Sequence, residues 1–414
     1  LTTIPDPFGK FESFGHHNNA KLRSFLDEFN FEYEFVSSTE KYKNGDFNST
    51  ILNIFDNYQK ILDIILPTLR AERKETYSPF LPISEKSGEV LQVKIEEYKM
   101  DSKTIVYKDP SLNKLTESEV TDGRCKLQWK VDWVMRWMSF GVDYEMCGKD
   151  LTESVELGSK ICRSLNSKPP TNLIYEMFLD EKGEKISKSV GNGISVDEWL
   201  KYASPESLSL YMFQKPKSAK KLHFDVIPKT VDDYLSHHNS FSNLDDTKKL
   251  DSPIWHIHSG NPKNFKTDIN FNTLTNLVSV SNTTDKKVIW SFINKYDENL
   301  NPENNQEFDR LIDFALNFYR DFILPKKKYL EIDSSNKDIF IDIINVLENQ
   351  ISSESSAEDI QTLLYEVGKK YKFDNLKDFF KLVYQVLLGQ DQGPRLGSFI
   401  KLFGIRETVD YINK

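Results

Sequence analysis

The sequence predicts a mixed α/β protein, in which an α/β region with a parallel sheet carries a β-rich insert and is followed by an all-helical region. Three observations support this prediction. Residues 142–179 read as strand, glycine turn, helix and strand, the pattern of a parallel βα unit. Residues 77–121 alternate with period two, as short strands do. Residues 270–414 place apolar side chains at helical spacing almost throughout.

Length and composition set the first bounds. A chain of 414 residues is long enough for two or three domains with cores of their own. It contains no run of about 18 apolar residues, so we expect no membrane span. The net charge of −9 excludes a surface that is basic all over, and any nucleic-acid contact must come from local patches. The 3 cysteines are widely spaced, which favours a reduced, cytoplasmic setting over a disulfide framework.

The first 70 residues are expected to form helices around one short strand. Helical spacing predicts a helix over 15–30 and a long helix over 48–66, and alternation predicts a strand over Phe31–Val36. His16 and His17 open the first helix without the preceding strand and the spacing of a nucleotide-binding histidine motif, so we reject that function for them.

The insert is expected to consist of short strands. Val90–Ile95 and Lys103–Tyr107 alternate and are separated by turn-forming residues. Residues 77–121 contain neither cysteine nor histidine, so we expect no zinc there and assign no metal ligand.

A tryptophan-rich helix is predicted after the insert. Trp129, Trp133 and Trp137 are spaced four apart and share one helix face, where at least two of them are expected to be core residues. Asp132 and Arg136 have the same spacing, which an ordinary surface ion pair explains.

A glycine turn follows the next predicted strand, Val142–Cys147. Gly148, Lys149 and Asp150 precede a helix that begins near Thr152. Ligands of open α/β sheets bind beyond the carboxyl ends of the strands. Glycine allows the backbone to approach a ribose and aspartate accepts hydrogen bonds from its hydroxyls, so Gly148 and Asp150 are candidate ribose-binding residues.

A loop rich in lysine, serine and glycine follows the last predicted strand, Tyr175–Leu179. We call residues 180–194 the lysine-serine loop. Its glycines allow movement, and its cations and hydroxyls suit a triphosphate whose charge shifts in a transition state. On composition alone, a solvated surface turn is the alternative. The candidate phosphate-binding residues are Lys185, Ser187, Lys188 and Ser189.

Two helix starts and a change of composition follow the loop. Ser195 has Glu198 three positions later, and Ser204 is followed by Pro205, both patterns typical of helix N-termini. Residues 240–265 are rich in Ser, Asn, Asp, Pro and Lys, which indicates a domain boundary.

Two basic patches are candidate contacts to a phosphate backbone. The first, at 215–221, is equally well explained as a solvated turn, and the second lies at 326–328 in the helical region. The candidate phosphate-backbone contacts are Lys217, Lys220, Lys221, Lys326 and Lys328.

With these residues in view, the chain resembles the bacterial branch of class I lysyl-tRNA synthetases. Lys185-Ile-Ser-Lys-Ser is similar to the KMSKS signature of class I aminoacyl-tRNA synthetases, with Ile186 in the place of methionine. The other stretches that carry the resemblance are Lys126-Leu-Gln-Trp-Lys-Val-Asp-Trp, Gly141-Val-Asp-Tyr-Glu-Met, Gly148-Lys-Asp-Leu and Gly389-Gln-Asp-Gln-Gly-Pro-Arg.

The resemblance implies a Rossmann-like nucleotide-binding domain over 1–190, with the β-rich insert at about 77–121. It implies a stem-contact and linker region over 191–265 and a helical anticodon-binding domain over 266–414. The implied reaction activates L-lysine with ATP and Mg²⁺ and transfers it to tRNA(Lys) in the cytoplasm. Neither DNA nor a membrane is an expected partner.

The resemblance also implies roles for single residues. Lys185 and Lys188 would neutralise phosphates while Ser187 and Ser189 hydrogen-bond or shape the loop. Gly148, Asp150 and Lys188 would bind ATP. Trp133 and Asp132 would recognise lysine, with an aromatic ring over its aliphatic stem and a carboxylate for its ammonium.

One signature of the family is missing. A His-Ile-Gly-His-like motif, which the family places upstream of the position of Leu1, does not occur in the chain. We therefore expect an N-terminally truncated fragment that is not catalytically competent by itself. Two alternatives stay open: another class I synthetase, of the glutamyl or cysteinyl type, and a non-catalytic tRNA-binding protein on the same scaffold.

Overall fold

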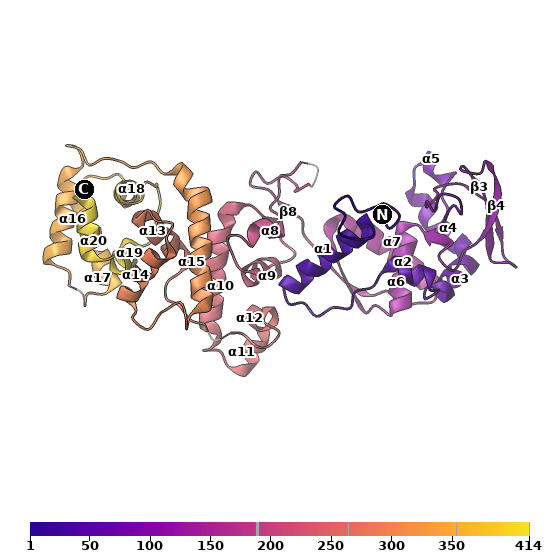
Figure 1. Ribbon diagram of the computed structural model, residues 1–414, viewed down its shortest axis with the longest axis horizontal. Helices are drawn as coiled ribbons and strands as arrows, with labels where there is room; N and C mark the ends of the chain where they lie inside the picture. Colours follow the sequence, from indigo (N-terminus) through magenta and orange to yellow (C-terminus); the bar gives the residue numbers. More distant parts are fainter. Residues whose placement is uncertain (188–189, 264, 353, 414) are drawn as a thin grey trace. The chain divides into compact units, whose positions relative to one another are not determined.

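The computed structural model describes residues 1–187, 190–263, 265–352 and 354–413. The chain divides into two compact units (Figure 1). The first unit comprises Leu1–Met177 and Pro216–Lys220, and the second comprises Phe178–Lys215 and Lys221–Lys414. The predicted fold class is confirmed: helices and small sheets are combined in the first unit, and the C-terminal region is helical.

The first unit begins with α-helices α1 (Phe14–Glu28), α2 (Ser38–Lys43), α3 (Asn48–Asp56), α4 (Tyr58–Ile65) and α5 (Ala71–Lys74), with a 3₁₀ turn η1 (Leu66–Thr68) before α5. The helix expected over 15–30 is confirmed by α1. The single helix expected over 48–66 is wrong, because the chain is interrupted at Asn57. The Asn57 side-chain amide donates to the Asn53 carbonyl at 2.9 Å, competing with the backbone ladder.

The strand expected over Phe31–Val36 is also wrong. These residues belong to none of the sheets among the described residues. Alternation of side chains gives a segment two faces, but a strand additionally needs a neighbour that pairs with its backbone.

Two small antiparallel sheets lie in the insert and directly after it. In one, β2 (Ile95–Lys99), β3 (Thr104–Asp109) and β4 (Lys114–Glu119) lie in that order, and in the other β1 (Phe80–Pro82) pairs with β5 (Cys125–Leu127). The strand expected over Lys103–Tyr107 is confirmed by β3, whereas the one expected over Val90–Ile95 lies too early. Lys103 has a φ of 57°, in the turn that pairs Lys99 with Thr104, and this pairing fixes where β2 lies.

The parallel unit follows the tryptophan helix. Its elements are α6 (Trp129–Phe140), β6 (Tyr144–Gly148), a 3₁₀ turn η2 (Lys149–Leu151), α7 (Thr152–Ser164) and β7 (Thr171–Tyr175). β6 and β7 are parallel, with Tyr144 opposite Thr171 and Gly148 opposite Tyr175. The strand expected at 142–147 and the helix expected from Thr152 are confirmed. Both strands therefore end on the same side, next to the Gly148 turn.

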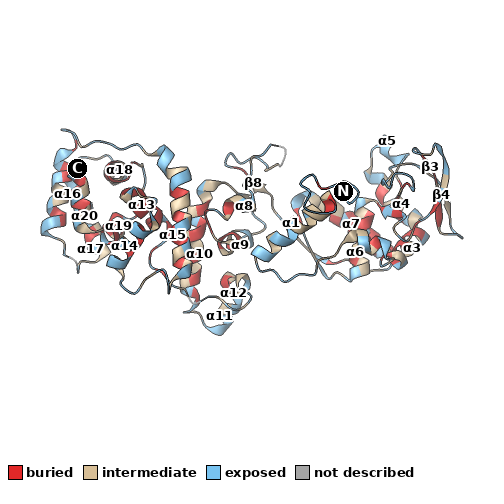
Figure 2. Ribbon diagram, in the orientation of Figure 1, coloured by how far each residue is buried: buried red, intermediate tan, exposed pale blue. Residues whose placement is uncertain are grey.

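The core of the first unit lies between α3, α4, α6, α7 and the insert (Figure 2). Fully buried side chains from each meet there, among them Phe55, Ile61, Tyr107, Val134 and Ile161. This packing fixes α6, the helix that presents the candidate lysine-binding residues.

The described residues of the second unit are mostly helical. Its strand β8 (Phe178–Leu179) pairs with β9 (Lys220–Lys221). Its helices up to residue 260 are α8 (Val196–Trp199), α9 (Pro205–Phe213), η3 (Phe224–Val226), α10 (Ile227–Phe241), α11 (Asp246–Asp251) and α12 (Pro253–Ile257). Both predicted helix starts are confirmed: Ser195 forms a reciprocal capping box with Glu198, and Ser204 caps α9, which has Pro205 in its first turn.

The helical prediction for residues 270–414 is confirmed within the described residues. The helices are α13 (Phe271–Ser281), α14 (Lys286–Tyr296), α15 (Gln306–Phe318), the π-helical η4 (Tyr319–Ile323), η5 (Leu324–Lys326), α16 (Lys337–Asn349), α17 (Ala357–Lys370), α18 (Leu376–Leu387), α19 (Leu396–Phe403) and α20 (Ile405–Ile412). Leu274, Leu277, Ile312, Leu364 and Phe399 are fully buried between them.

Candidate functional site

The turn after β6 brings the Asp150 carboxylate against the backbone of Gly148. A Cβ added to Gly148 would lie 2.7 Å from Asp150 Oδ1, so only glycine leaves the aspartate where it is. Lys149 Nζ lies 2.7 Å from Glu176 Oε1, an ion pair that joins the residue after β6 to the residue after β7. The hydrogen bond from Lys149 lowers the pKa of Glu176. Two strand ends are thus held together beside Asp150.

The three tryptophans of α6 stack along the helix. Ring centroids are 5.2 Å apart for Trp129 and Trp133 and 5.3 Å apart for Trp133 and Trp137. Trp137 is buried, Trp133 is half-buried against the core and Trp129 is 52% exposed. The indole N–H groups of Trp133 and Trp137 both donate to Glu145 Oε2, at 3.2 and 2.8 Å. The expectation that at least two of them are core residues is therefore met, and Trp129 remains on the surface.

Asp132 is buried, and both of its carboxylate oxygens are engaged. Arg136 Nη2 lies 2.6 Å from Oδ2, and the Tyr42 hydroxyl donates to Oδ1 at 2.5 Å. The Tyr42 oxygen in turn accepts the Leu127 N–H at 3.3 Å. Burial, and next the charge of Asp132, raise the pKa of Tyr42 far above its ordinary value. The ion pair that the spacing indicated is thus an interior one at its aspartate end.

A pocket of about 420 Å³ opens beside this pair. Its volume suits a small-molecule ligand. Trp129, Asp132 and Arg136 line it from α6, whereas Trp133 does not. The remaining lining residues are Leu81, Val90, Gln92, Lys126, Leu127 and Gln128. Any ligand there meets an exposed indole, a paired carboxylate and the Arg136 guanidinium.

The lysine-serine loop begins directly after β8. Leu179 and Lys185 form an antiparallel bridge across its base. The Asn192 side chain reaches back over the loop: its Oδ1 accepts the Ser187 N–H at 2.9 Å and its Nδ2 donates to the Lys185 carbonyl at 3.2 Å. Lys188 and Ser189, two of the four predicted phosphate-binding residues, lie outside the described residues.

The predicted site residues therefore fall into two groups. Asp132, Trp133, Gly148 and Asp150 belong to the first unit, where one helix and one strand end carry them. Lys185 and Ser187 belong to the second unit. Tyr42, Glu145 and Asn192 were not predicted as site residues from the sequence. Tyr42 has no local signal, because it lies 90 residues before its partner Asp132, whereas Asn192 lies close to the loop motif in the sequence, after Val190 and Gly191.

The first basic patch is only partly available to a partner. Lys217 and Lys221 are exposed, but Lys221 Nζ already donates to the Glu181 carbonyl at 2.9 Å. Lys220 is half-buried, and burial lowers its pKa.

The second basic patch divides between surface and interior. Lys326 and Lys328 are exposed. Lys327 turns inward, donates to the Ser279 carbonyl at 2.7 Å and lies 5.3 and 4.8 Å from the ring centres of Tyr319 and Tyr329. Burial lowers the pKa of Lys327 to about 8.

An aromatic pocket of about 440 Å³ lies close to this patch in the sequence and the structure, since Tyr329 lines it. Phe292 and Phe403 stack at 5.2 Å in its wall, and Tyr411 and Asn282 add polar groups. The Tyr319 hydroxyl donates to Asn282 Oδ1 at 2.8 Å, which orients that amide.

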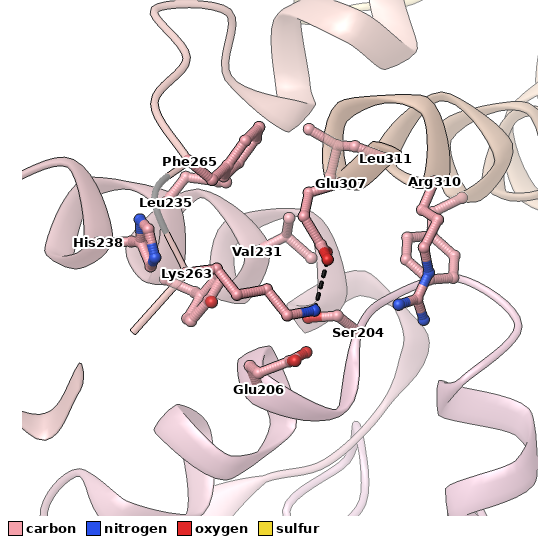
Figure 3. A pocket seen from close by; sticks show the side chains of 12 residues that line it. Ser204, Glu206, Val231, Leu235, His238, Lys263, Phe265, Glu307, Arg310 and Leu311 are labelled. Carbon is pink, nitrogen blue, oxygen red and sulfur yellow. Dashed lines mark hydrogen bonds and ion pairs between the residues drawn. The ribbon is translucent and has the colours of Figure 1, made fainter. Parts of the chain in front are cut away.

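Another cavity, shown in Figure 3, lies inside the second unit and contains none of the predicted site residues. Lys263 from the segment before α13 and Glu307 from α15 point toward each other in it, with Nζ and Oε1 2.5 Å apart. Its volume of about 40 Å³ admits no more than a few water molecules. It is therefore not a substrate site.

No helix among the described residues is both long and apolar enough to cross a membrane.

Comparison with known proteins identifies relatives over the whole chain. The family described as tRNA synthetases class I (K) matches residues 1–261. A lysine–tRNA ligase of Rickettsia felis is 51% identical over 414 residues, which are 100% of this chain and 78% of the relative. One of Rickettsia bellii is 50% identical over 416 residues, covering 100% of this chain and 79% of the relative. A solved glutamate–tRNA ligase of Elizabethkingia meningosepticum, in complex with its amino acid, is 12% identical, covers 99% of this chain and 90% of its own, and has a TM-score of 0.34.

Proposed function

The chain belongs to the class I lysyl-tRNA synthetase family, and we infer from this membership that it activates lysine with ATP and transfers it to tRNA(Lys). One observation carries this conclusion: lysine–tRNA ligases are about half identical to the chain along its full length. Identity of that extent leaves no reason to prefer the glutamyl or cysteinyl alternatives, or a non-catalytic scaffold.

The reaction has two steps. A carboxylate oxygen of lysine attacks the α-phosphorus of ATP, the bond from that phosphorus to the bridging oxygen of the β-phosphate breaks, and pyrophosphate leaves. A ribose hydroxyl at the 3′ end of the tRNA then attacks the lysyl carbonyl, and AMP leaves. Mg²⁺ in such reactions is bound largely through phosphate oxygens, and we assign it no protein ligand. The protein must therefore supply positioning and positive charge.

We assign the positive charge to the lysine-serine loop. Lys185 and Lys188 would neutralise charge that develops on the leaving pyrophosphate, and Ser187 and Ser189 would hydrogen-bond to phosphate oxygens or shape the loop. What supports this is the motif itself, Lys-Ile-Ser-Lys-Ser, on a loop that begins directly after a strand.

We assign the ATP ribose to the Gly148 turn. The absence of a side chain at Gly148 leaves the Asp150 carboxylate in place, and the carboxylate can accept hydrogen bonds from sugar hydroxyls. The Lys149–Glu176 pair supports both strand ends.

Lysine recognition is assigned to the surface of α6 that carries Trp129, Asp132 and Trp133. The exposed Trp129 indole, which stacks on Trp133, offers a flat ring for the aliphatic stem of the substrate. Asp132 already binds Arg136 and the Tyr42 hydroxyl, so the substrate ammonium would compete with Arg136 for the carboxylate.

The tRNA would contact the remaining regions. We propose residues 1–190 as the catalytic domain, 191–265 as the stem-contact region and 266–414 as the anticodon-binding domain. Lys217, Lys220 and Lys221 would contact the acceptor side. The exposed Lys326 and Lys328 would hold phosphates near the aromatic pocket, whose rings suit an unstacked base.

Lys188→Ala in the full-length enzyme tests the central assignment. It should lower lysine-dependent ATP–pyrophosphate exchange by about 100-fold, the scale of losing one transition-state donor, while substrate binding falls much less. Lys182→Ala, the same change at an exposed loop lysine outside the motif, is the matched control. Near wild-type exchange in Lys188→Ala would remove the loop from the mechanism.

A further inference from the structure

We propose that Asp180 and Asn192 are positioning residues that hold the backbone of residues 185–187, the described start of the Lys-Ile-Ser-Lys-Ser motif, in the shape in which the motif acts on ATP. This rests on the proposed function of the lysine-serine loop. Neither residue belongs to the motif, and neither would touch the substrate; they act through the backbone of Lys185 and Ser187.

Asp180 lies at the base of the lysine-serine loop. It is the first residue after β8 and is only 7% exposed. Its Oδ1 accepts the Glu184 N–H at 2.8 Å, and its own N–H donates to the Glu184 carbonyl at 2.8 Å. The bond that the carboxylate accepts from the Glu184 N–H, together with that from Asn192, lowers the pKa of Asp180, so the carboxylate is ionised at neutral pH.

The strand before Asp180 is itself held. The Leu222 N–H donates to the Leu179 carbonyl at 2.7 Å, and Lys221 Nζ donates to the Glu181 carbonyl at 2.9 Å. The loop therefore starts from a fixed base.

The Asn192 side chain crosses the lysine-serine loop. Its Nδ2 donates to Asp180 Oδ2 at 2.8 Å and to the Lys185 carbonyl at 3.2 Å, and its Oδ1 accepts the Ser187 N–H at 2.9 Å. One side chain thus connects the base of the loop to the backbone on both sides of Ile186. Only an amide has a donor and an acceptor in this arrangement, because aspartate lacks the N–H groups.

Gly193 allows the returning chain to pack closely against Ile186. A Cβ added there would lie 2.5 Å from Ile186 Cγ2, closer than side chains approach each other. Ile186 is therefore packed against the returning chain while its two neighbours are held by Asn192.

The arrangement answers a requirement of the chemistry. A loop of lysines and glycines that had to order itself at each turnover would lose conformational entropy in the transition state. A loop whose central segment is already held can move as one piece and deliver its charges together. Loss of the Asn192 hydrogen bonds should therefore slow the chemical step more than it weakens ground-state binding.

The test uses the full-length enzyme and lysine-dependent ATP–pyrophosphate exchange with tRNA present. Asn192→Ala should lower kcat by about 10- to 100-fold, with the KM for lysine within about two-fold of wild type, because a misplaced group costs rate. The control is Glu181→Gln, which changes an exposed loop side chain and should leave kcat unchanged. Thermal unfolding of each variant shows that the fold is intact.

An exchange of the two side chains separates positioning from general damage. Asn192→Asp places two carboxylates in contact and Asp180→Asn removes the charge, so each alone should lower kcat. The double variant Asp180→Asn with Asn192→Asp restores an amide–carboxylate pair and an acceptor for the Ser187 N–H. It should recover kcat at least several-fold over Asn192→Asp, a coupling that independent sites would not show.

Two results would overturn the proposal. One is an unchanged kcat in Asn192→Ala while Lys188→Ala still loses exchange, which would show that the loop acts without the Asn192 hydrogen bonds. The other is a double variant no better than the product of the single ones. If Lys188→Ala itself kept full exchange, the proposed function of the loop would be wrong. That outcome is distinct from a failure of the positioning role of Asp180 and Asn192.

Discussion

Asp132 and Arg136, one helical turn apart on α6, form an ion pair in which Oδ2 and Nη2 are 2.6 Å apart and only the arginine end reaches the surface. The Tyr42 hydroxyl donates to the other carboxylate oxygen, Oδ1. A substrate ammonium would have to compete with a cation that is already bound, in a place where an unpaired carboxylate is costly. This competition decides whether Asp132 recognises lysine or only fixes the pocket.

Asp132→Asn tests the competition. If the substrate ammonium replaces Arg136, the KM for lysine should rise by about 10-fold or more, because the site loses a charged hydrogen bond. Stability should also fall by about 1–3 kcal/mol, since a buried charge-assisted bond is removed. Steady-state kinetics and denaturant unfolding measure the two effects.

Tyr42→Phe is the matched control for this variant. It removes the other hydrogen bond of Asp132 without changing the charge, so stability should fall by about 1 kcal/mol and the KM for lysine should stay the same. An unchanged KM in Asp132→Asn would assign the carboxylate to the ion pair alone.

Gly148→Ala tests the ribose assignment. The new Cβ would lie 2.7 Å from Asp150 Oδ1 and displace the carboxylate, so the KM for ATP should rise by about 10-fold, the scale of one lost hydrogen bond to a charged group. The KM for lysine should change little. In an Asp150→Ala background the glycine substitution should have no further effect; an additive effect would contradict the assignment to Asp150.

The burial of Lys327 predicts how the stability of the protein depends on pH. Its pKa in the folded protein is about 8, below its ordinary value of 10.5, because of burial. Between these pH values the unfolded chain binds a proton that the folded chain has lost, so the contribution of Lys327 to the free energy of unfolding rises with pH. Burial also raises the pKa values of Tyr319 and Tyr329, the two rings that lie beside the Lys327 ammonium.

Lys327→Met removes this contribution. The stability of the variant relative to wild type should be most favourable below pH 8 and should decline as the pH rises toward 10.5, in denaturant titrations at several pH values. Lys328→Met, at the exposed neighbour, should show no such trend. A pH-independent difference for Lys327→Met would show that its ammonium is not destabilised by burial.

The exposed lysines of the same patch make a prediction about tRNA. Lys326→Glu with Lys328→Glu should weaken the binding of tRNA(Lys) and reduce its dependence on salt, because two phosphate contacts are lost. The preference over an anticodon-swapped tRNA should persist. Tyr329→Ala, in the aromatic pocket, should instead reduce that preference. Equal affinity of the wild-type enzyme for the two tRNAs would return the helical region to a structural role.

Some features were predictable because their causes are local. The caps at Ser195 and Ser204, the strand and helix on either side of Gly148 and the helices beyond residue 270 follow from spacing and from side chains that bond their own backbone. Where the local pattern was ambiguous, the prediction failed. Alternation over Phe31–Val36 resembled a strand that has no partner, and Asn57 divides what read as one helix.

The sequence by itself determined the family, the fold class and the loop motif, since these depend on residue types in order along the chain. Only the tertiary structure decided which side chains are buried, which are exposed and which hydrogen-bond to each other. It placed the hydroxyl of Tyr42 on Asp132, turned Lys327 inward while Lys326 and Lys328 stayed outside, and put Trp129 rather than Trp133 on the pocket. The physical reason is that burial and hydrogen-bond partners come from segments far apart in the chain, and no local pattern encodes which of them meet.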